Sequence, residues 1–172
     1  MFETIKTILQ DPVRAQYPLV SMTEALSRLV NVKQQESESL HDYVKRFKQL
    51  RDVAKSQMGS TILNEFVDYL TGYTNASTTE KLLMKQEAYP RWMAYLLIRG
   101  TDQTKYGSLQ KGFVSQFLLG NYQYPKSITT ATDVLSNHKI DQRYYDNQKR
   151  NRDCPQDKKT LYETPATKEK PD

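Results

Sequence analysis

The stretch that decides the fold is residues 32–50, VKQQESESLHDYVKRFKQL. Its second half begins like a helix, because the Ser39 hydroxyl can accept a hydrogen bond from a backbone N–H of the first turn and Asp42 follows three residues later. Burying a residue such as Phe47 contributes about 1.5–3 kcal/mol, so the apolar side of this helix must face a core or a partner. The apolar residues that recur at helical spacing are Leu40, Tyr43, Val44, Phe47, Leu50 and Ala54.

Polar residues in the same stretch predict a brace between the entering chain and the helix. Gln34 and Glu38 precede the helix, and Arg46 lies two turns into it, one turn beyond Asp42. The guanidinium of arginine presents its N–H donors in a rigid fork, which suits tying a loop to a helix. We expect the chain to fold back so that Gln34, Glu38 and Arg46 bond one another. The alternative is an ordinary solvated helix face.

This pattern resembles the major homology region of Gag capsid proteins from retroviruses and LTR retrotransposons. The retrotransposon form, Glu-Ser-Leu-x-x-Tyr-Val-x-Arg-Phe-Lys, is the more similar, since Gln35 stands where the retroviral form usually has Gly. In that family the segment opens the C-terminal capsid domain and stabilises it without performing chemistry. The residues that carry the resemblance are Gln34, Glu38, Leu40, Asp42, Tyr43, Arg46, Phe47 and Leu50.

The resemblance covers about residues 21–138 and implies a domain organisation. Residues 1–31 would form N-terminal helices, the end of a reduced or truncated N-terminal capsid region, because about 30 residues are too few for a complete domain. Residues 32–140 would form a helical domain like the capsid C-terminal domain. Residues 141–172 would be a basic, polar tail, largely disordered from about 151. The 64–90 stretch is longer than the family leads us to expect, which suggests an inserted helical hairpin.

Apolar periodicity without sustained alternation predicts an all-α fold, a compact multi-helix bundle. Residues 92–98, WMAYLLI, are the most apolar run, which we interpret as a buried helix, with a buried strand as the alternative. Pro90 is expected to end or kink the helix before it. Residues 143–152 are expected to extend the last helix by a turn or two.

Local signals set the bounds of the other predicted helices. A short helix is predicted at 2–9. Capping boxes predict helix starts at Ser21, with Glu24, and at Ser77, with Glu80. The other predicted helices are one along the apolar stripe from Ile62 to Tyr73, one closed by Gly120 and one capped by Ser127. The helix from Ser39 should end at Gly59.

Composition narrows the function classes. The chain has 172 residues, a formal charge of +5 and one cysteine, Cys154, so an intramolecular disulfide is impossible and a reducing compartment, the cytoplasm, is expected. We find no secretory signal and no apolar run of the roughly 20 residues needed to span a bilayer, so no membrane partner is expected. A zinc site needs about four Cys or His ligands, and the chain has one Cys and two His.

These observations predict a protein without enzymatic activity, cofactor or small-molecule substrate. The resemblance implies a structural Gag-like capsid protein that self-assembles into a particle through weak helix-face contacts, with Trp92 as the candidate contact residue. RNA is a further candidate partner, through Tyr144, Tyr145, Lys149, Arg150 and Arg152 in the tail. The alternative is a non-assembling helical adaptor or nucleic-acid-binding protein.

Overall fold

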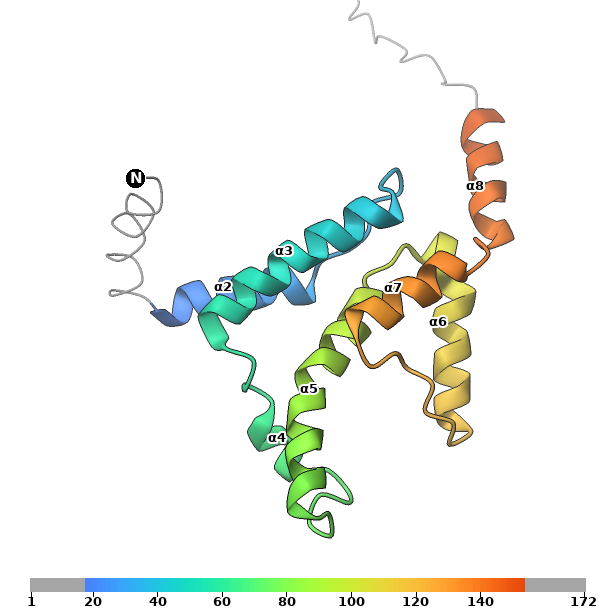
Figure 1. Ribbon diagram of the computed structural model, residues 1–172. Coiled ribbons are helices and arrows are strands. Elements are labelled where there is room, and N and C mark those ends of the chain that lie inside the picture. The colour runs from blue at the N-terminus through green and yellow to red at the C-terminus, as the bar shows by residue number, and fades with distance from the viewer. Residues whose placement is uncertain (1–17, 154–172) are drawn as a thin grey trace, which may run out of the picture.

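The computed structural model describes residues 18–153, and that part of the chain contains seven helices and no strand (Figure 1). The predicted all-α fold is therefore confirmed, while the helix predicted at 2–9 and the tail from residue 154 lie outside the described residues. The helices are α2 (Pro18–Val30), α3 (Leu40–Met58), α4 (Asn64–Asp68), α5 (Thr78–Arg99), α6 (Gln103–Leu118), α7 (Ile128–Asn137) and α8 (Gln142–Asp153).

Helix α5 is the central element of the bundle. It packs against α3, α4 and α7, whereas α2 lies along α3 and α8 packs on α6 (Figure 1). The short α4 and the start of α5 form a hairpin at one end of the molecule. This arrangement places residues 31–39, the chain between α2 and α3, next to the junction of α5 and α6, since the Gln34 N–H donates to the Gly100 carbonyl at 2.8 Å.

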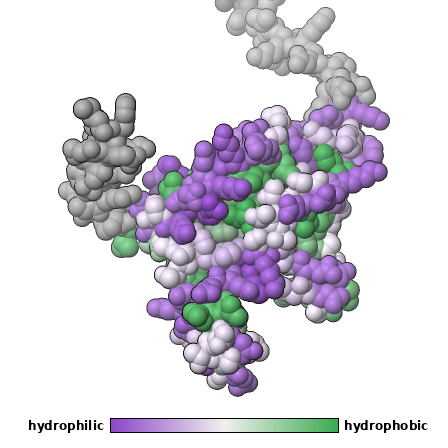
Figure 2. Space-filling model, viewed as in Figure 1, coloured by the Kyte–Doolittle hydropathy of each residue, from purple (hydrophilic) through white to green (hydrophobic). Residues whose placement is uncertain are grey.

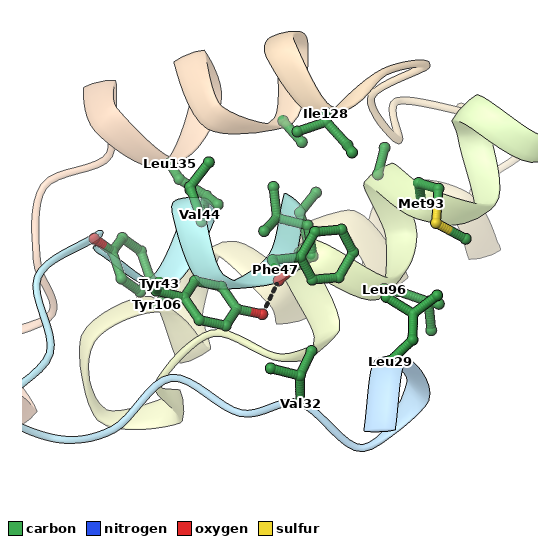
Figure 3. Close-up of a cluster of buried hydrophobic side chains, with 14 of the residues drawn as sticks. Leu29, Val32, Tyr43, Val44, Phe47, Met93, Leu96, Tyr106, Ile128 and Leu135 are labelled. Atoms are coloured by element: carbon green, nitrogen blue, oxygen red, sulfur yellow. Dashed lines mark hydrogen bonds between the residues drawn. The ribbon is translucent and has the colours of Figure 1, made fainter. Parts of the chain in front are cut away.

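The core forms where the apolar stripe of α3 meets the second half of α5 (Figure 3). Tyr43 and Phe47 are completely buried, and the Tyr43 hydroxyl donates to the Leu97 carbonyl at 2.9 Å. This bond satisfies the one polar group that Tyr43 takes into the core. Leu29 of α2 and Leu135 of α7 belong to the same cluster, so helices far apart in the sequence share one core.

Capping chemistry explains most of the helix ends. The Ser39 hydroxyl accepts the Asp42 N–H at 3.1 Å, and α3 ends at Gly59, whose φ of 77° favours glycine. Ser77 and Glu80 form the complete reciprocal capping box at the start of α5. Ser127 caps α7. These predicted ends are confirmed.

Two predicted helices have other bounds than expected. Ser21 does not open a helix, because α2 already includes Pro18, and proline is well tolerated in a first helical turn. The stripe from Ile62 to Tyr73 forms only the five-residue α4, since Val67 alone of its apolar residues is buried. An apolar stripe stabilises a helix only where it packs against a core.

Two further differences concern α5 and α8. Pro90 does not end a helix: α5 continues through it, with buried Tyr89 and Met93 on either side holding both halves to the core. Residues 142–153 do not extend α7 but form a separate helix, α8, after a break at 138–141. The Asp141 carboxylate accepts the Ser108 N–H at 2.8 Å and so fixes the start of α8 to α6.

Gly100 is required by close packing rather than by an unusual backbone angle. A Cβ atom at this position would lie 2.1 Å from the Tyr43 hydroxyl oxygen and 2.6 Å from the Val32 carbonyl oxygen. We expect Gly100→Ala to lower the free energy of unfolding by about 1–3 kcal/mol, because backbone and a buried ring must move. Gly112→Ala on α6 is the matched control, since its Cβ meets open space and alanine favours helix. Denaturant unfolding of both variants checks this, and equal stabilities would contradict it.

Candidate functional site

The Arg46 guanidinium holds the Glu38 carboxylate in a two-pronged ion pair. The Arg46 Nε atom lies 2.8 Å from Glu38 Oε1, and Nη2 lies 2.7 Å from Oε2. The same Nη2 donates to the Lys33 carbonyl at 2.7 Å. The Glu38 side chain is only 12% exposed and Arg46 is 36% exposed, so the pair is partly shielded from water. The expected contact between the entering chain and the helix is therefore present.

Gln34 bonds Glu38 as expected, but it does so at the Glu38 backbone, and its second partner is Asp102 rather than Arg46. Its buried side chain donates to the Glu38 carbonyl at 3.1 Å and accepts the Asp102 N–H at 3.1 Å. With the backbone bond to Gly100, these contacts fix the loop between α2 and α3 to the start of α6. We call the side chains of Gln34, Glu38, Arg46 and Lys105, with their partners, the brace.

Lys105 is a member of the brace that sequence reasoning missed. It is 7% exposed, and its Nζ atom donates to the Glu36 carbonyl at 2.6 Å and lies 3.8 Å from the Asp102 carboxylate. The ammonium also lies 4.9 Å from the centre of the Tyr144 ring, so α8 covers it. A buried lysine needs such partners. The only sequence feature that could have indicated a paired Lys105 is Asp102, which stands three residues earlier.

The charges within the brace stabilise one another. The hydrogen bond from Arg46 lowers the pKa of the Glu38 carboxyl, an effect that burial opposes and that the Gln35 backbone N–H reinforces. The same hydrogen bond raises the pKa of Arg46. Burial raises the pKa of the Tyr43 hydroxyl, so this group stays protonated and keeps donating to Leu97. The brace thus consists of charged and neutral groups that each have a fixed partner.

The remaining motif residues divide between core and cap. Leu40 and Leu50 are half-buried and pack against the core cluster that contains Tyr43 and Phe47. Asp42 is exposed and accepts a 2.6 Å hydrogen bond from the Ser39 hydroxyl. Polar and apolar motif residues therefore have one combined effect, which is to set the position of α3 against the loop and against α5.

A Ser–His–Asp cluster, also missed from the sequence, joins α6 to the start of α8. His138 Nε2 lies 3.3 Å from the Ser108 hydroxyl and 3.4 Å from Asp141 Oδ1. Because one ring nitrogen faces both partners, the imidazole cannot relay a proton from serine to aspartate through its two nitrogens. Burial raises the pKa of Asp141, but hydrogen bonds from Ser108 and His138 outweigh it and lower that pKa. The cluster therefore links α6 to the segment between α7 and α8.

The candidate contact residues lie on separate surfaces. Trp92 is half-buried and lines a groove of about 370 Å³ with Tyr95 and Tyr124. In α8, Tyr145, Lys149 and Arg150 are exposed. Tyr144 is half-buried beneath Lys105, and its hydroxyl accepts a hydrogen bond from Gln148 at 2.7 Å. Arg152 also belongs to α8, and its side chain lies outside the described residues.

Two other kinds of site are absent from residues 18–153. No group of three or more His, Cys, Asp or Glu side chains there could hold a metal ion. None of the described helices is both long and apolar enough to cross a bilayer. Comparisons with family models, with curated proteins and with solved structures found no match for this chain.

The brace makes a direct prediction about stability. Arg46→Ala leaves the Glu38 carboxylate with only the Gln35 N–H as a donor and the Lys33 carbonyl without the Arg46 bond, so the free energy of unfolding at pH 7 should fall by about 1–3 kcal/mol. Arg28→Ala, which breaks an exposed pair with Glu24 in α2, is the matched control and should change it by less than about 0.5 kcal/mol.

The pH dependence of the Arg46 effect identifies Glu38 as the partner. The pKa of Glu38 is lower in the folded than in the unfolded protein, so the stabilisation is present above the unfolded value of 4.5 and is lost as pH falls through the folded value. The difference between wild type and Arg46→Ala should therefore shrink at acidic pH. A difference that is absent at pH 7, or that does not change with pH, would contradict the brace.

Proposed function

We propose that this protein is a structural, self-assembling capsid protein of the retrotransposon Gag type. The observation that carries the proposal is the brace. Gln34, Glu38 and Arg46 stand at the spacing of the major homology region, and their side chains fix the start of α3 against the junction of α5 and α6. In that family the same motif stabilises the capsid C-terminal domain, so both the residues and their structural role agree with the proposal.

The chemistry of the brace favours a structural protein over an enzyme. Each polar group of Gln34, Glu38 and Lys105 described above has a protein partner at hydrogen-bonding distance. A stiff unit with weakly adhesive surfaces is what multivalent assembly requires, because repetition converts weak contacts into a stable shell. Trp92 lies on one such surface, in the groove between α5 and the end of α6. The subunits would assemble in the cytoplasm.

RNA is the second partner that we propose, through α8. Lys149 and Arg150 are exposed on this helix together with Tyr145, so charge and ring stacking are both available to a polynucleotide. Tyr144 would contribute less than the sequence suggests, because Lys105 already packs over its ring. A helical protein that binds RNA without assembling is the alternative function that this surface supports.

Size-exclusion chromatography with light scattering, and negative-stain microscopy, test the proposal. We expect the mean mass to rise with protein concentration, and RNA to lower the concentration required at about 50 mM salt more than at 200 mM, because released counterions drive phosphate binding. A monomer at every concentration, with and without RNA, would contradict assembly. A monomer that binds RNA in a salt-dependent way would instead identify the alternative function.

A further inference from the structure

The described chain exposes two large apolar surfaces of different shape. The first, which we call the hairpin patch, stands on the α4–α5 hairpin, and the Lys85–Asp68 ion pair at 2.8 Å holds α4 against α5 there. Figure 2 shows this hairpin as a projecting lobe that carries a hydrophobic cluster bordered by pale and hydrophilic surface. The hairpin patch consists of Ile62, Phe66, Tyr69, Leu70, Leu82 and Leu83, whose side chains are between 39% and 87% exposed.

The second surface is concave. It is the groove of about 370 Å³ that contains Trp92, taken together with Leu118 and Leu119, which follow the lining residue Phe117 in sequence at the end of α6 and are 77% and 74% exposed. We call this the aromatic groove. Its lining residues are Arg91, Trp92, Tyr95, Phe117, Tyr122 and Tyr124.

Ring contacts hold the walls of the aromatic groove in place before anything binds. Tyr124 stacks on Phe113 at 5.0 Å between ring centres, and Tyr95 lies 5.8 Å from Tyr124. Phe117 meets Tyr122 edge-on at 5.8 Å. A preformed groove loses little side-chain freedom on binding, which favours association.

The charge of the groove argues for a protein occupant. Its one lining cation, Arg91, already pairs with Glu87 one turn earlier on α5. A nucleic acid would need unpaired cations for its phosphates, and it would gain little from the exposed aliphatic side chains of Leu118 and Leu119. An apolar protein surface gains from burying both the rings and these leucines.

The exposed areas of the two surfaces are similar. With about 200 Å² for a fully exposed aromatic side chain and about 150 Å² for an aliphatic one, each surface exposes on the order of 600 Å², the most that a monomer usually leaves uncovered. Complete burial of both would remove about 1,200 Å² from water, which is the lower end of the range of specific interfaces. A projecting lobe also fits a groove better than it fits a second lobe.

We propose that the aromatic groove of one copy receives the hairpin patch of the next copy. This inference rests on the proposed self-assembly and names its contact. Because the two surfaces differ, the contact is head-to-tail, and each bound copy leaves one surface free for another. Growth can therefore continue into a particle, whereas a single self-complementary surface would stop at a dimer.

Two surface variants test the contact. Phe66→Ser with Tyr69→Ser disables the hairpin patch, and Phe117→Ser with Leu118→Ser disables the aromatic groove. All four residues are exposed, so both proteins should fold, which circular dichroism checks. Val53→Ser, an exposed residue of α3 outside both surfaces, is the matched control and should assemble like wild type. Each variant alone should need at least about tenfold more protein to associate.

Mixing the two variants gives the sharpest result. Each retains the surface that the other has lost, so light scattering should detect a one-to-one heterodimer and nothing larger. If one variant alone still dimerises as wild type does, or if the mixture stays monomeric while wild type assembles, the head-to-tail contact is wrong but self-assembly stands. If wild type is monomeric at every concentration, both proposals are wrong.

Discussion

The two-pronged bond between Arg46 and Glu38 is the interaction on which the rest of the structure depends. The loop between α2 and α3 has no regular secondary structure, so its carbonyls lack the intrahelical partners that helical carbonyls have. Three long side chains supply partners instead, because Arg46, Lys105 and Gln34 donate to the carbonyls of Lys33, Glu36 and Glu38. These bonds tie the loop to α3 and to α6.

Much of this arrangement follows from the sequence because it is local. The caps at Ser39 and Ser77, the glycine that ends α3, and the pairing of Glu38 with Arg46 all involve residues within a few turns of each other. The partners of Gln34 and Lys105 could not be predicted in the same way. Asp102 lies 68 residues from Gln34, and Glu36 lies 69 residues from Lys105, so only the packed helices bring them together.

The failed predictions have a common physical cause. Apolar periodicity from Ile62 to Tyr73 indicated a long helix, but periodicity does not reveal whether a core lies opposite, and only Val67 finds one. Pro90 indicated an end or a kink of the helix; α5 does not end there, because burial of Tyr89 and Met93 compensates for a missing backbone hydrogen bond. The same limit explains the exposed residues at Phe66 and Phe117: the sequence marks them as core, whereas the structure leaves them on the surface. Apolar residues without an internal partner are the natural candidates for an external one.

The fixed frame and the exposed apolar surfaces are thus formed by separate parts of this chain. The brace and the Tyr43–Leu97 bond fix α3, α5 and α6 relative to one another, and the hairpin and the end of α6 present the apolar surfaces from that fixed frame. The proposed repeated contact would need such a frame, because each copy would have to present its two surfaces at a constant angle for a closed particle to form.

Native-state hydrogen exchange at the Gln34 and Asp102 amides tests the brace most directly. The Gln34 N–H donates to the Gly100 carbonyl and the Asp102 N–H to the Gln34 side chain, so both report whether the loop stays in place. We predict that both amides exchange only through global unfolding, with the same free energy as the core amide of Leu97, although they lie outside helices. Exchange at a free energy far below the global value, while Leu97 stays protected, would show that the loop opens independently and that the brace does not hold the fold together.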